Sequence, residues 1–148
     1  MTFDDLPADW PTRPITDPAL FLDVVDLCVS EHHRAAGAVY VLLCDPQARL
    51  VQPCALPTGN RVSDARGVGD QERRGILDPF ATALATQQPG GGLVVVVARP
   101  GRQEPTPADR RWHRAAQAVC DRHDVRLLAA AVATPAGITP LTGSAETA

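Results

Sequence analysis

Apolar residues along the chain follow two patterns, one with the spacing of a helix and one nearly continuous. Apolar positions three and four residues apart predict amphipathic helices over residues 18–36, 71–88 and 106–123. Short, almost unbroken apolar runs bounded by turn residues predict buried strands. These strands are expected over residues 38–44, 49–56, 93–98, 125–133 and 138–141.

The order of these elements predicts the fold class. A helix, two strands, a helix, a strand, a helix and two final strands indicate a mixed three-layer α/β domain. Short turns join two of the strand pairs, so we expect a partly antiparallel sheet. Pro53 indicates that the second strand lies at an edge or ends early, because proline donates no hydrogen bond to a neighbouring strand. Helices should cover both faces of the 93–98 strand, with Val95 facing one side and Val96 the other.

Individual residues predict where the helices begin and end. The first helix should start with Asp17 as its cap and Pro18 in its first turn, and should end at Gly37. Pro79 lies inside the second helical pattern and predicts either a kink or a later start. Asp109 suits the first turn of the third helix, near the positive end of the helix dipole.

Length and composition indicate one domain with flanking segments. A chain of 148 residues, 45% of them hydrophobic, can bury one sizeable core. We expect an extended arm over residues 1–15, the domain over 16–141 and a disordered tail over 142–148. Residues 57–70 combine glycines with many polar side chains, which predicts a long loop.

Charge, cysteine spacing and the N-terminal segment argue against several classes of protein. A net charge of −3 disfavours general nucleic-acid binding, which uses a basic excess. The four cysteines form no Cys-x-x-Cys pair, which disfavours the usual zinc sites, although their number allows a disulfide. No apolar stretch reaches the ~20 residues that span a bilayer, and the N-terminus lacks the features of a signal peptide. We therefore expect a cytoplasmic protein with no membrane partner.

The segment after the most apolar strand carries the candidate chemistry. It reads VVVVARPGRQEPTPADRRW over residues 94–112, and DVRLL follows over residues 124–128. This order resembles the RadC-like branch of the JAB/MPN/JAMM metalloprotease family. In that branch an apolar strand runs into a His-x-His-Pro turn, Ser-x-x-Asp opens a helix, and another strand with a short return follows. TGNRVSDARGVGDQERRGILDPFATAL, residues 58–84, is also similar to the corresponding RadC segment.

The resemblance covers residues 38–141 and implies a cytidine-deaminase-like three-layer fold. Thr106 stands where the family has Ser, and Asp109 stands where it has a metal-binding carboxylate. The two histidine positions fall on Val96 and Ala98 or, with a small gap, on Ala98 and Pro100, and neither pair can bind a metal. The resemblance therefore implies a non-catalytic domain without metal or cofactor. Such a domain would act as a regulatory or interaction module that binds another protein or a second copy of itself.

A groove retained at the former metal site would be the binding surface. Its arginines are expected at a solvated rim, or as guanidinium forks that hold an anionic partner. The residues expected to line this groove are Arg99, Pro100, Arg102, Thr106 and Asp109, with Arg110 or Arg111 at its rim.

Two alternatives belong to other functional classes. A hydrolase with a displaced metal site would combine Asp109 with Glu31, His32 or His33, although adjacent residues on a helix point ~100° apart. A nucleotide or small-anion binder would use the arginine-rich loop and the PGGG segment, residues 89–92. PGGG precedes a strand, whereas a phosphate-binding glycine loop follows a strand and opens a helix. This order disfavours the nucleotide binder.

Overall fold

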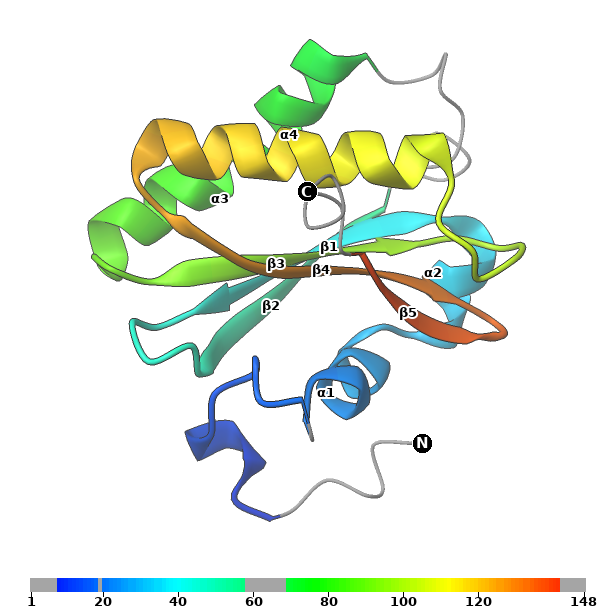
Figure 1. The fold of residues 1–148 in the computed structure, drawn as a ribbon, viewed down its shortest axis with the longest axis horizontal. Helices are drawn as coiled ribbons and strands as arrows, with labels where there is room; N and C mark the ends of the chain where they lie inside the picture. The colour runs from blue at the N-terminus through cyan, green and yellow to red at the C-terminus, as the bar shows by residue number, and fades with distance from the viewer. Residues whose placement is uncertain (1–7, 19, 58–68, 142–148) are drawn as a thin grey trace.

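The computed structural model describes residues 8–18, 20–57 and 69–141 of the chain. Its helices are the 3-10 helix η2 (Trp10–Thr12) and the α-helices α1 (Phe21–Cys28), α2 (Glu31–Ala36), α3 (Asp70–Gln87) and α4 (Pro107–His123). Its strands are β1 (Ala38–Cys44), β2 (Leu50–Pro57), β3 (Gly92–Ala98), β4 (Arg126–Thr134) and β5 (Gly137–Leu141). Figure 1 shows the strands as a central layer between the helices.

The five strands form one mixed sheet in the order β2-β1-β3-β4-β5. Strands β3 and β4 are parallel, and the other neighbouring pairs are antiparallel. This arrangement confirms the predicted α/β class with a partly antiparallel sheet. Strand β2 is at one edge, as Pro53 predicted, and β5 with Pro140 is at the other.

Helices cover both faces of the sheet. The pair α3 and α4 lies on one face, and α1 lies on the opposite face (Figure 1). Val95 packs into the core on the α3–α4 side, where the Trp112 side chain is fully buried. Val96 packs into the core on the α1 side. The prediction that β3 is buried on both faces is therefore confirmed.

The first predicted helix is wrong as a single element, because the chain forms two short helices there. Val29, at the end of α1, has extended backbone angles of φ −97° and ψ 113°. Ser30 then caps α2, and its Oγ accepts a hydrogen bond from the backbone N–H of His33 at 3.1 Å. The N-cap residue of α1 is Leu20 instead of the predicted Asp17, and the Asp17 carboxylate pairs with Arg13 at 2.8 Å.

Helix α3 passes through its internal proline. The helix begins at Asp70 and includes Pro79, so the predicted later start is wrong. A proline in this position lacks the N–H that would bond the carbonyl of Gly75, four residues earlier. The helix therefore lacks one internal hydrogen bond at its middle.

A bulge in β4 changes which side chains face α1. Leu93 and Val94 are neighbours in β3, but their partners in β4 are Leu127 and Ala129, so Leu128 is the extra residue. A Cβ atom at Gly92 would lie 2.7 Å from Cγ of Leu128, so only glycine leaves room for this side chain. The bulge thus places two adjacent β4 residues, Leu128 and Ala129, against the α1 side of the sheet.

The described part of the N-terminal arm packs against the domain. The Ile15 side chain is 2% exposed, and its backbone N–H donates to the Ala48 carbonyl at 2.7 Å. Trp10 is half-buried against the same core. The predictions for residues 1–7, the 58–68 part of the long loop and the 142–148 tail lie outside the described residues.

Candidate functional site

The loop between β3 and α4 ends in a capping box. Thr106 Oγ1 accepts a hydrogen bond from the backbone N–H of Asp109 at 3.2 Å. The Asp109 carboxylate accepts in return from the backbone N–H of Thr106 at 2.8 Å. These reciprocal bonds satisfy donors that a helix start leaves free, and they confirm the predicted helix start at this position.

The same carboxylate forms a buried ion pair with Arg99. Arg99 is 3% exposed and Asp109 is 0% exposed. Nη2 of Arg99 donates to Oδ2 of Asp109 at 2.8 Å, and Nε donates to Oδ1 at 3.0 Å. The expectation of a solvated Arg99 at the rim is therefore wrong, because the residue follows the buried β3 directly and its side chain turns inward.

Arg99 also organises the backbone of the loop. Its Nη1 group donates to the carbonyls of Pro100 at 3.2 Å and Arg102 at 2.8 Å, and Nη2 donates to Glu104 at 3.0 Å. Together with the bonds to Asp109, these contacts engage all of the donors that a guanidinium offers. Arg99 therefore has no donor left for an anionic partner.

Of the other residues predicted to line the groove, Pro100, Arg102 and Thr106 contact this pair through backbone groups. Pro100 and Arg110 are exposed, and Thr106 is half-buried at the cap. The Arg102 side chain is 87% exposed and lies 3.6 Å from Glu104, a contact that contributes little in water. Arg111 is half-buried and faces α3 instead of the loop.

A catalytic metal does not fit the loop. A hydrolytic zinc needs about three protein ligands and an open position for water. Val96 and Ala98 are buried apolar residues, and the Asp109 carboxylate is already bonded to Arg99 and Thr106. Throughout the described part of the chain, no three His, Cys, Asp or Glu side chains come together as a metal site.

The displaced metal set is also not brought together. Glu31 and His32 are exposed on α2, whereas Asp109, in the first turn of α4, is fully buried. The His33 ring is engaged elsewhere, since its Nδ1 and the Tyr40 hydroxyl are hydrogen-bonded at 2.6 Å. The proposal of a hydrolase using these four residues is therefore not supported by their positions.

Of the four cysteines, Cys44 and Cys120 are buried, and Cys28 and Cys54 are half-buried. All four are free, so the disulfide that their number allows is not formed. Burial raises the pKa of Cys28 to about 11 and that of Cys120 to about 12. Burial, reinforced by the charge of Asp45, raises the pKa of Cys44 to about 12. Thiols with such values are protonated at neutral pH, which disfavours a cysteine nucleophile.

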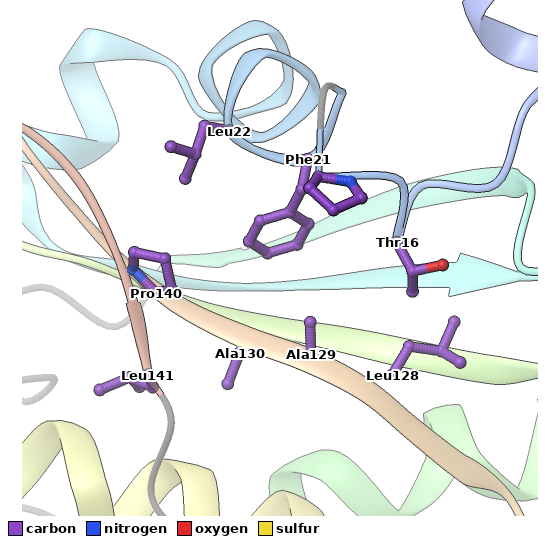
Figure 2. A pocket seen from close by; sticks show the side chains of 9 residues that line it. Thr16, Phe21, Leu22, Leu128, Ala129, Ala130, Pro140 and Leu141 are labelled. Atoms are coloured by element: carbon purple, nitrogen blue, oxygen red, sulfur yellow. The ribbon is translucent and has the colours of Figure 1, made fainter.

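The sequence did not predict an apolar pocket on the α1 side of the sheet. It has a volume of about 450 Å³, within the range of small-molecule pockets. Figure 2 shows Phe21 and Leu22 reaching from α1 toward the sheet, with Pro140 across from them. The residues that line it are Thr16, Pro18, Phe21, Leu22, Leu128, Ala129, Ala130, Pro140 and Leu141. The bulge at Leu128, which periodicity does not reveal, helps to form its floor.

Comparison with known proteins adds no assignment. No protein-family model matches the sequence, and no curated protein is significantly similar to it. None of the helices in the described residues combines the length and apolar character that a bilayer-spanning segment requires.

Proposed function

We propose that the chain is a non-catalytic domain of the RadC-like JAB type with a cytidine-deaminase-like fold, which binds another protein or a second copy of itself. The order of the elements supports this proposal. Strand β3 leads through a loop into the capped helix α4, and β4 and the short β5 follow. The Thr106–Asp109 capping box stands in the place of the family's Ser-x-x-Asp motif.

The buried Arg99–Asp109 pair carries the non-catalytic part of the proposal. In the family this carboxylate binds a metal ion, and here a guanidinium supplies the positive charge at 2.8 Å. A guanidinium has no open coordination position, so it cannot bind and activate a water molecule as zinc does. In this proposal Arg99 maintains the shape of the loop, but the loop has no group that activates water for hydrolysis.

We propose that the partner contacts the apolar pocket beside α1. Its walls include Phe21, Leu22 and Leu128, and an apolar hollow of this kind is suited to an apolar side chain of another protein. Addition of a strand to the sheet is disfavoured, because Pro53 and Pro140 interrupt the donors of the two edge strands. A partner is therefore expected to bind through side chains at the pocket.

Zinc is expected to leave the melting temperature of the protein unchanged to within about 1 °C, because a ligand stabilises only a native state that binds it. The measurement is thermal unfolding with added zinc and with chelator, together with elemental analysis of the purified protein. Stoichiometric zinc would contradict the proposal. So would a zinc-dependent rise in melting temperature that disappears in Asp109→Asn.

The Leu22→Glu variant is expected to co-purify with about tenfold less partner than the parent does, because the substitution puts a charge into the contact surface. The measurement is co-purification from the native host, with sedimentation velocity to detect a second copy as the partner. Leu27→Glu is the matched control, since Leu27 lies on the same helix, is 40% exposed and does not line the pocket. Equal partner retention by both variants, at unchanged melting temperature, would reject the pocket as the contact surface.

A further inference from the structure

Arginines from two helices converge on a small pocket between α3 and α4. Arg74 comes from α3, and Arg111 and Arg114 come from α4. They line a pocket of about 90 Å³ together with Asp70 and Ala115. This volume equals that of about three water molecules at ~30 Å³ each, which is room for one small oxyanion.

A fourth arginine is buried behind this pocket. Arg73 is 1% exposed and lies 5.7 Å from the ring centre of Trp112. Its Nη1 group donates to Asp70 at 2.9 Å, whereas its buried Nε and Nη2 groups have no hydrogen-bond partner. Burial lowers the pKa of Arg73, and the positive charge of Arg111 acts in the same direction. The positive charge of Arg73 is therefore unfavourable in the protein without a bound anion.

The acidic residues nearby do not neutralise the arginines. Arg74, Arg111 and Arg114 take part in no ion pair among residues 8–18, 20–57 and 69–141. Asp70 is already paired with Arg73, and Glu72 is the other carboxylate that acts on Arg73. The residues that line the pocket carry three positive charges and the one negative charge of Asp70, which leaves an excess of two positive charges.

We propose that Arg74, Arg111 and Arg114 bind the phosphate group of a small phosphorylated molecule. A phosphate monoester carries a charge of about −1.5 to −2 at neutral pH, which matches the excess, whereas a carboxylate supplies only one negative charge. Guanidinium groups form paired, charge-assisted hydrogen bonds with phosphate oxygens. The site lies on the α3–α4 side of the sheet, so it is distinct from the apolar pocket beside α1.

An adjoining groove has room for the rest of such a molecule. It has a volume of about 620 Å³ and shares Asp70 and Arg74 with the arginine pocket. Its Asp78 is hydrogen-bonded to His123 at 2.7 Å, and this bond lowers the pKa of Asp78. The groove is polar, which suits a hydroxyl-bearing carbon skeleton better than an apolar one.

Inorganic phosphate and glycerol 3-phosphate are expected to raise the melting temperature along a saturable curve, by about 4 °C at ten times the Kd. Sodium chloride and acetate at matched ionic strength should give no saturable rise. The measurement is thermal unfolding supported by titration calorimetry on the full chain. A short single-stranded DNA tests whether the phosphate comes from a nucleic-acid backbone. Tighter binding of this DNA than of glycerol 3-phosphate would overturn the proposal.

Arg114→Gln and Arg74→Gln are expected to raise the Kd for phosphate about tenfold each, since each removes a charge-assisted contact. Both side chains are exposed, so the variants should fold as the parent does. Arg110→Gln is the matched control, because Arg110 is exposed on the same helix and does not line the pocket. A phosphate effect that is linear in concentration, or equal in all variants, would show general salting-out stabilisation and would overturn the site.

Discussion

Replacing Arg99 with methionine is expected to lower the free energy of unfolding by about 3–5 kcal/mol, because the fully buried Asp109 carboxylate loses its charged partner. Methionine keeps most of the side chain's apolar volume, so the loss reports on the charge and its hydrogen bonds. The carbonyls of Pro100, Arg102 and Glu104 lose their donor at the same time. Chemical denaturation measures the change, and the melting temperature should fall by about 10 °C.

Arg102→Met is the matched control for this experiment. Arg102 lies in the same loop, but its side chain is 87% exposed, so the expected change is within about 0.5 kcal/mol. Arg99→Met/Asp109→Leu should recover part of the stability lost in Arg99→Met, because it removes the unpaired charge as well. If Arg99→Met unfolds like the parent, the ion pair does not hold the loop, and the main support for a non-catalytic loop is lost.

The sequence did not reveal the role of Arg99, and the reason is physical. Its partner Asp109 lies ten residues away across a loop rich in proline and glycine, and no helical or strand spacing relates the two positions. Arginine is usually exposed, so a position in a polar loop suggested a rim residue. One signal was present, since the loop carbonyls need donors and Arg99 follows a strand that is buried on both faces.

The capping box at α4 could be predicted because it is local. Thr106 and Asp109 are three residues apart, and that spacing itself defines the contact. The break between α1 and α2 is also local, and Ser30 followed by Glu31 is a recognisable helix start. The apolar spacing before Ser30 concealed this signal, because it runs continuously into the next helix.

The arginine pocket could not be predicted from one helix at a time. Arg110 and Arg111 are adjacent in sequence, and both were assigned to the loop because they follow it. On α4 they point in different directions, so Arg110 faces solvent and Arg111 faces α3 near Arg74. Periodicity gives the faces of each helix, but it does not say which helix packs against which.

The sequence did predict that the most apolar strand, β3, is covered by helices on both faces. A substitution in this strand is therefore expected to have the second large effect. Val95→Asp is expected to lower the free energy of unfolding by roughly 4–5 kcal/mol, because it buries an unpaired carboxylate. Val95 is 0% exposed and lies between Val41 of β1 and Ala130 of β4, beneath α3 and α4. Equilibrium denaturation compares the variant with the parent.

The pH dependence of Val95→Asp separates burial of a charge from poor packing. Burial raises the pKa of the new carboxyl group above its unfolded value, so the folded state binds more protons between the two values. The stability of the variant relative to the parent should therefore fall as the pH rises from about 4 to 8. Val51→Asp is the control, since Val51 is 52% exposed on the edge strand β2 and should change stability little at any pH. A pH-independent loss in Val95→Asp would mean that its carboxylate reaches water, which is incompatible with a β3 strand covered by helices on both faces.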